Sequence, residues 1–249
     1  MAVKKVALAS TWLSVTDVIQ RLGRARENRD QHLKLLNALE GQVTQRRINV
    51  ERSLADLPSN ERSKVVTRTV NGHRAELRRK SADARLAHVR EAGRIRDEVA
   101  TVRIHFQSPV QMLMRENLGS ERRSRLLGQI AQSGPTELAS LAAFAAATGD
   151  KELGAALCTR ASQMPAGERP FSPQELADAL VGETFRNVTR AIMEVDRIAA
   201  ETVGADTSFE TGRTNLTRNL QAAFMRRDEE AVGGDLSDLE ALTTDKEEG

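Results

Sequence analysis

Histidine is the side chain most able to bind a metal or move a proton near neutral pH, and this chain has four: His32, His73, His88 and His105. The first three fall on the apolar stripes of two long expected helices. His73 and His88 are 15 residues apart, about 22 Å along one helix, so they cannot share a ligand. His32 and His88 can face each other across the helix pair, but few carboxylates are near enough to complete a metal site. We therefore expect a polar layer that fixes the helix register, with no metal and no cofactor.

Other reactive side chains lack the neighbours that catalysis requires. Cys158 lies in an alanine-rich stretch without a nearby histidine, which predicts a buried structural thiol. Glu194 and Asp196 fall on different sides of an expected helix and are expected to be solvated. The sequence after Gly119 lacks the glycine and lysine pair of a phosphate-binding loop. We therefore predict that the protein is not an enzyme and takes no small-molecule substrate.

Clusters of basic residues are candidates for binding a ligand by charge. The residues best placed to neutralise phosphates are Arg74, Arg78, Arg79, Lys80, Arg122 and Arg123. Acidic residues are interleaved with these clusters, and aromatic residues, at 3%, are too scarce to stack on bases. The first interpretation is a solvated, salt-bridged helix face, and the alternative is a nucleic-acid interface.

Charge is distributed unevenly along the chain. Residues 16–107 hold 20 basic and 12 acidic residues, a net charge of +8, whereas residues 228–249 hold 9 acidic residues and one lysine, a net charge of −8. This asymmetry predicts either pairing between molecules or an acidic tail that folds onto the basic helices. In the second case the tail would regulate nucleic-acid binding.

Two long stretches with helical spacing must position the histidines. In residues 15–57, stripe positions recur every 3.5 residues on average, which is typical of a coiled coil, and in residues 66–106 they recur every 3.64 residues. Pro58 separates the two stretches and disfavours helix for the residue before it. The sequence therefore predicts a long antiparallel helical hairpin over residues 16–107, after an N-terminal arm of residues 1–15.

The stripes of this hairpin are thin in the middle, where serine, alanine and histidine replace large apolar side chains. We expect a third helix, from this chain or a neighbour, to cover them. Protein contacts are expected at the stripe residues Leu22, Leu36, Leu39, Val43, Val66, Val70, Leu77, Ile95 and Val99. In the acidic tail, residues 228–249, an amphipathic turn is expected to dock onto a partner through Leu236, Leu239 and Leu242.

Shorter helices are expected in residues 108–163, between clear start and stop signals. Ser108 before Pro109, Thr136 and Asp150 are the expected caps. Two prolines mark residues 164–172 as a linker.

A two-helix segment, residues 173–227, is expected after this linker. Its first helix should stop at Gly204, and the sequence from Thr207 to Glu210 resembles a capping box that starts the second helix. The side chains expected to face inward on the second helix are Leu216, Leu220, Ala223 and Phe224.

The sequence as a whole predicts an all-α protein: a coiled-coil-like hairpin, a bundle of shorter helices and an acidic tail. We expect a structural or assembly protein that associates with itself or with other subunits of a large particle. Helical components of tailed phages, including scaffolding, internal and tail-associated proteins, are similar in architecture. A single cysteine fits a reducing compartment. Because no apolar run approaches the ~20 residues of a membrane span, a soluble protein of the cytoplasm or a viral particle is expected.

Overall fold

The computed structural model describes residues 13–213 and 216–237. Every regular element in these residues is helical, with eight α-helices and two short 3₁₀-helices, η1 and η2. This confirms the prediction of an all-α fold. Residues 1–12 of the expected N-terminal arm and residues 238–249 of the acidic tail lie outside the described residues.

The chain forms two compact units. The long-helix unit consists of Arg21–Asp97 and Glu194–Asp228. The short-helix unit consists, among the described residues, of Glu98–Met193 with residues 13–20 and 229–237. Each unit has its own cluster of buried apolar side chains, and each is described by itself below.

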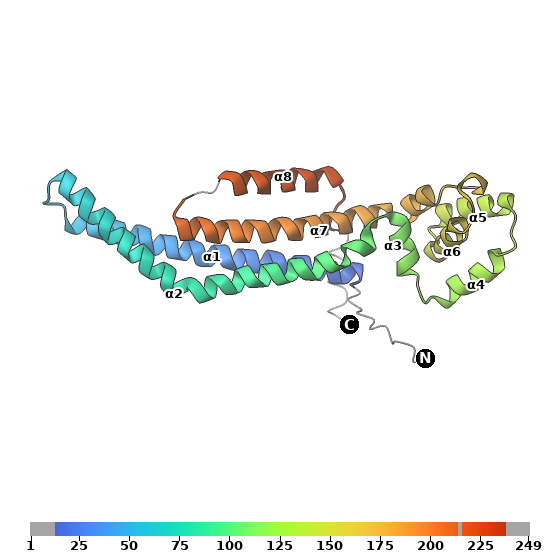
Figure 1. Ribbon diagram of the computed structural model, residues 1–249, viewed down its shortest axis with the longest axis horizontal. Coiled ribbons are helices and arrows are strands. Elements are labelled where there is room, and N and C mark those ends of the chain that lie inside the picture. Colours follow the sequence, from blue (N-terminus) through green and yellow to red (C-terminus); the bar gives the residue numbers. More distant parts are fainter. Residues whose placement is uncertain (1–12, 214–215, 238–249) are drawn as a thin grey trace, which may run out of the picture. The chain divides into compact units, whose positions relative to one another are not determined.

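Helices α1 and α2 run in opposite directions through the long-helix unit (Figure 1). Helix α1 spans Val15–Ser53, helix α2 spans Ser59–Val102, and Pro58 lies in the connection between them. Contacts across the pair join rising residue numbers on α1 to falling numbers on α2: Arg24 to Glu91, Asn28 to His88 and Glu40 to Arg74. The two helices are therefore antiparallel here, while coiled-coil packing of the pair stays a prediction.

Helix α7, Pro173–Thr211, provides the third helix of the long-helix unit. Its residues from Glu194 onward lie along α1 and α2 (Figure 1). Phe209 packs in a cluster with side chains of both helices, namely Leu36, Leu39, Val43 and Leu77. The third helix that the thin stripes require thus comes from this chain.

The prediction that this helix stops at Gly204 is wrong. Thr207 does not cap a new helix, because its hydroxyl donates to the carbonyl of Val203 at 2.8 Å, within α7. A glycine inside a helix costs about 1 kcal/mol relative to alanine. Burial of Phe209 one to two turns later can offset this cost, since a buried phenylalanine contributes about 1.5–3 kcal/mol.

Glycine does end α7, but at Gly212, where φ is +67°. Helix α8 follows as Leu216–Val232 and lies beside α7 (Figure 1). The predicted second helix therefore begins and ends later than the sequence indicates. Asp228, the first residue of the predicted tail, belongs to α8, and the helix is followed by Gly233 and Gly234 with positive φ angles.

Four helices separated by turns build most of the short-helix unit: α3 (Pro109–Glu116), α4 (Glu121–Ile130), α5 (Pro135–Thr148) and α6 (Lys151–Ser162). The 3₁₀-helices η1 (Arg103–Phe106) and η2 (Ala166–Glu168) flank them. The predicted caps Ser108 and Asp150 are confirmed, since their side chains accept backbone N–H groups at 3.2 and 3.0 Å. The predicted cap Thr136 is wrong, because Pro135 already takes the first helical position and Gly134 precedes it.

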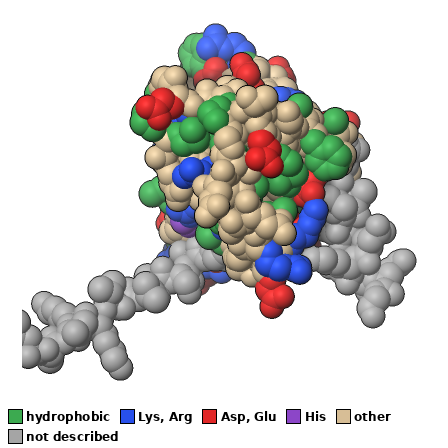
Figure 2. Space-filling model, turned by 90° about the vertical axis from the view of Figure 1, so that its right-hand side faces the viewer, with side chains coloured by type: hydrophobic (Ala, Val, Ile, Leu, Met, Phe, Trp, Pro, Cys, Tyr) green, Lys and Arg blue, Asp and Glu red, His purple; other side chains and the backbone are tan. Residues whose placement is uncertain are grey.

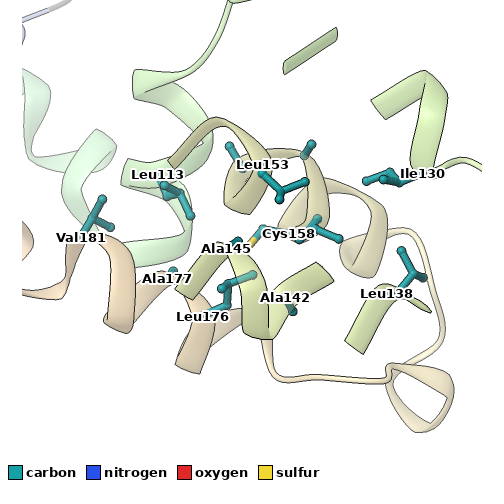
Figure 3. Packing of buried hydrophobic residues seen from close by; sticks show 13 residues of the cluster. Leu113, Ile130, Leu138, Ala142, Ala145, Leu153, Cys158, Leu176, Ala177 and Val181 are labelled. Carbon is teal, nitrogen blue, oxygen red and sulfur yellow. The ribbon is translucent and has the colours of Figure 1, made fainter. Parts of the chain in front are cut away.

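Helix α6 lies at the centre of the short-helix unit and packs against α3, α4 and α5. Figure 3 shows Leu113, Ile130 and Leu138 around it, with Cys158 inside the cluster. Gly154 permits a close contact on α6, because a Cβ atom there would lie 2.2 Å from Cδ1 of Leu180 on α7. Small side chains on α6 therefore set how near its neighbours can pack.

We expect Gly154→Ala to lower the free energy of unfolding by about 1 kcal/mol, because the half-buried Leu180 must move from its contact with α6. The matched control is Gly128→Ala in α4, where a Cβ atom meets nothing within 4 Å. This control should raise stability by about 0.5–1 kcal/mol through helix propensity. Urea unfolding of both variants checks the pair, and equal effects would contradict the packing described for α6.

Candidate functional site

The stripe residues predicted for protein contacts lie in the interior of this chain. Leu22, Leu36, Leu39, Val43, Val66, Leu77, Ile95 and Val99 are buried, and Val70 is half-buried. Of the three tail leucines, Leu236 is also buried, whereas Leu239 and Leu242 lie outside the described residues. In the described chain these side chains therefore pack against its own helices, and their contact with a partner stays a prediction.

A polar layer interrupts the apolar contacts between α1 and α2, as the sequence predicts. Nδ2 of Asn28 donates to the carbonyl of His88 at 3.0 Å, and Oδ1 of Asn28 lies 2.8 Å from Nδ1 of His88. The rings of His32 and His88 have their centroids 5.4 Å apart. Because a shift along the helix would break the reciprocal bonds of Asn28, this layer fixes the register.

Arg85 on α2 binds α7 within the long-helix unit. Its Nη1 donates to Oδ1 of Asp206 at 2.7 Å, and its Nη2 donates to Oε2 of Glu210 at 2.6 Å. Nε donates to the hydroxyl of Ser81 at 3.0 Å, and the guanidinium lies 5.0 Å from the ring centroid of Phe209. The Arg85 side chain is 4% exposed, so nearly all of its donors must be satisfied by protein groups.

This buried ion pair was not predicted from the sequence. The predicted helix stop at Gly204 would have separated Asp206 from the helix that contains Glu194. Since α7 continues through Gly204, Asp206 and Glu210 lie one turn apart on the same helix and face Arg85 together. Because a helix stop was predicted at Gly204, Asp206 and Glu210 were not recognised as partners of Arg85.

His32 is fully buried in the same region, with Nε2 3.8 Å from Oδ1 of Asp206. Neither of its ring nitrogens forms a hydrogen bond with another described residue. Burial lowers the pKa of His32; Asp206 acts to raise the pKa, and the charges of His88 and Arg85 lower it further. The folded protein therefore favours the neutral imidazole.

Most of the basic residues proposed for nucleic-acid binding form ion pairs or hydrogen bonds with other residues of this chain. Arg74 pairs with Glu40, Lys80 with Glu76, Arg122 with Asp150 and Glu152, and Arg123 donates to the hydroxyl of Thr159. Arg78 donates from Nε to the carbonyl of Phe209 at 3.1 Å, near the C-terminal end of α7. Arg79, Lys80 and Arg122 are exposed, whereas Arg74, Arg78 and Arg123 are half-buried. Lys80 and Arg122 stay 68% and 52% exposed despite their ion pairs, so part of this charge remains at the surface.

Glu194 is not solvated, which corrects the expectation from its spacing. Its side chain is 8% exposed and accepts hydrogen bonds from Nε and Nη2 of Arg26, each at 2.8 Å. Burial acts to raise the pKa of Glu194, but the bonds and charge of Arg26, with further help from Arg197 and Arg29, hold the pKa below its ordinary value. This carboxylate links α7 to α1 and is unsuited to proton transfer.

Cys158 is fully buried, and burial raises the pKa of its thiol to about 11. The nucleophilic thiolate is therefore scarce at neutral pH. The described residues contain no group of three potential metal ligands, and none of their helices is long and apolar enough to cross a bilayer. Cys158 is therefore a buried packing residue of the short-helix unit.

Helix α8 turns its apolar side toward solvent, whereas the sequence predicted that this side faces inward. Leu216, Leu220 and Phe224, expected to face inward, are 73%, 59% and 55% exposed. The side of α8 that faces α7 uses Arg218, which donates from Nη1 to the hydroxyl of Thr207 at 2.9 Å and to the carbonyl of Val203 at 3.3 Å. Polar anchoring of one side thus leaves the apolar side in solvent.

Elsewhere the exposed apolar side chains are more dispersed. On the side of the molecule in Figure 2, apolar groups are separated by acidic and basic ones. The chain matches no protein-family model, no curated protein and no solved structure. The exposed side of α8 is therefore the candidate functional surface, on physical grounds alone.

Removal of Arg85 should destabilise the long-helix unit strongly. Arg85→Met keeps most of the side-chain volume but leaves Asp206 without its cationic partner, so we expect a loss of about 3–5 kcal/mol. The control is Arg47→Met, which breaks an exposed pair with Glu51 and should cost about 0.5 kcal/mol or less. Urea unfolding measures both, and similar losses would contradict the role given to Arg85.

Stability should fall in mild acid because of His32. The unfolded chain binds a proton to this histidine near pH ~6.5, whereas the folded state binds it only at lower pH. The contribution of the neutral His32 imidazole to the free energy of unfolding is therefore complete above about pH 6.5. It is lost as the pH falls toward the lowered pKa. The urea midpoint should drop between about pH 7.5 and about pH 5.5, and His32→Leu should reduce that drop. A substitution of the half-buried His73 is the control. If the drop in the urea midpoint is the same in His32→Leu as in the wild-type chain, the assignment to His32 is contradicted.

Proposed function

We propose that this chain is a helical structural protein that acts by associating with copies of itself, as one component of a larger assembly. The observation that carries the proposal is the exposed side of α8, where Leu216, Leu220 and Phe224 are all more than half exposed. Single exposed leucines are ordinary on protein surfaces, but three large apolar side chains on successive turns of one helix form a contact surface. Association would remove this surface from water.

The rest of the described structure supports a packing role. Helix α7 packs on both long helices through Phe209 and Asp206, and α8 lies on the helix that makes these contacts. His88 and Asp206 are used for contacts between helices, through their bonds with Asn28 and Arg85. The larger assembly that we propose for this protein includes the virion of a tailed phage.

Nucleic-acid binding is the weaker alternative. It requires free cationic side chains in a continuous patch, and the six predicted residues are mostly paired with acidic or carbonyl groups of this chain. No second function is therefore proposed.

The test is the molar mass of the protein as a function of concentration, by sedimentation equilibrium up to high micromolar concentration. We expect the mass to rise for the wild-type chain and to stay at the monomer value for a triple variant, Leu216→Gln, Leu220→Gln and Phe224→Gln. Glutamine has good helix propensity, so α8 should persist and the change should report contact alone.

A matched triple variant controls for the loss of surface hydrophobicity. Ile48, Val65 and Leu86 are also exposed, at 43%, 43% and 40%, but on α1 and α2. Their replacement by glutamine should leave self-association unchanged. A wild-type chain that stays monomeric over the whole range would overturn the proposal.

A further inference from the structure

We infer that the partner of the exposed side of α8 is α8 of a second copy, packed in the antiparallel direction. The inference rests on the proposed self-association and adds the surface, the direction and the register of the contact. It follows from the spacing of the exposed residues, from their sizes and from the position of one arginine.

The spacing on α8 is that of a helix that packs against another helix. Leu216, Leu220, Ala223 and Arg227 follow one another at intervals of four, three and four residues, and all four are exposed. Intervals of three and four keep one seam facing a neighbouring helix over several turns. Phe224 flanks this seam, and the guanidinium of Arg227 lies 5.4 Å from the centre of its ring. The exposed side of α8 thus has the pattern of a short helix-packing seam.

The direction follows from what each residue would meet. Parallel pairing with equal residues opposite would place Arg227 against Arg227 of the second copy and Ala223 against Ala223, which combines charge repulsion with a gap. Antiparallel pairing about a twofold axis between positions 221 and 222 places Leu220 over Ala223 and Leu216 beside the aliphatic part of Arg227. Large side chains then meet small or flexible ones, and the two arginines lie at opposite ends.

The inner side of α8 leaves this seam free for a partner. Arg218 bonds to Val203 and Thr207, and Nη2 of Arg226 donates to Oε1 of Glu201 at 3.2 Å, all on α7. An open hollow of about 430 Å³ lies along the inner side and is lined by Ala199, Val203 and Met225 among others. A helix that rotated into this hollow would bury the seam within its own chain, which is the competing arrangement.

The seam is short, so the pairing is expected to be weak. Stable interfaces bury about 800 Å² on each partner, more than three or four exposed side chains can supply. Association at high micromolar concentration is the expected range for one contact, and other contacts in an assembly would add to it.

Cysteine cross-linking of two single variants tests the direction. Leu216→Cys and Arg227→Cys are prepared separately in the full chain, with buried Cys158 left in place and the wild-type chain as the background control. In the antiparallel register equal positions are displaced by 11 residues, about 16 Å, too far for a disulfide with its Cα separation of about 4.4–6.8 Å. We expect disulfide-linked dimers only when the two variants are mixed, with the link between positions 216 and 227 identified by peptide mass spectrometry.

Every other outcome counts against the inference. Dimers in each variant alone would show the parallel direction. No link in the mixture, while the molar mass still rises with concentration, would place the contact elsewhere and leave the proposed self-association intact. No link and a constant monomer mass would overturn both. In that case, slow alkylation of the thiol introduced by Leu216→Cys would show that α8 has rotated into its own hollow.

Discussion

A single buried arginine connects the parts of the long-helix unit. Arg85 reaches from α2 to two carboxylates of α7, and the same guanidinium lies over Phe209, which fills the apolar cluster beneath. A cation so nearly excluded from water is tolerable only while Asp206 remains in contact with it. The position of α7 on the helix pair is therefore set by an ion pair as much as by apolar burial.

Scarcity of large side chains explains why such polar contacts are needed. With aromatics at 3% and alanine, serine and histidine in the middle of the stripes, α1 and α2 bury little apolar area between them. Asn28 and His88 supply directional bonds at this level, and Glu194 and Arg26 supply a further link to α7. These bonds contribute specificity of register, where methyl groups alone would allow the helices to slide.

Helix α8 is likewise attached through polar contacts. Its contact with α7 uses arginine side chains and carbonyl or hydroxyl acceptors, so its leucines and phenylalanine are not required for attachment. A helix that is held by polar bonds on one side and apolar on the other is suited to join two bodies.

Sequence alone determined the helical class, because helix propensity, caps such as Ser108 and Asp150, and the absence of strand patterns are local properties. The spacing also placed His32 opposite His88, since positions on a regular helix can be computed. The candidate surface on α8 could not be predicted. Its residues were recognised as apolar, but whether they face solvent depends on where α7 ends. The sequence does not show whether Gly204 or Gly212 ends this helix. Tertiary packing decided between them, because only the folded chain shows that continuing past Gly204 buries Phe209 and brings Asp206 and Glu210 to Arg85.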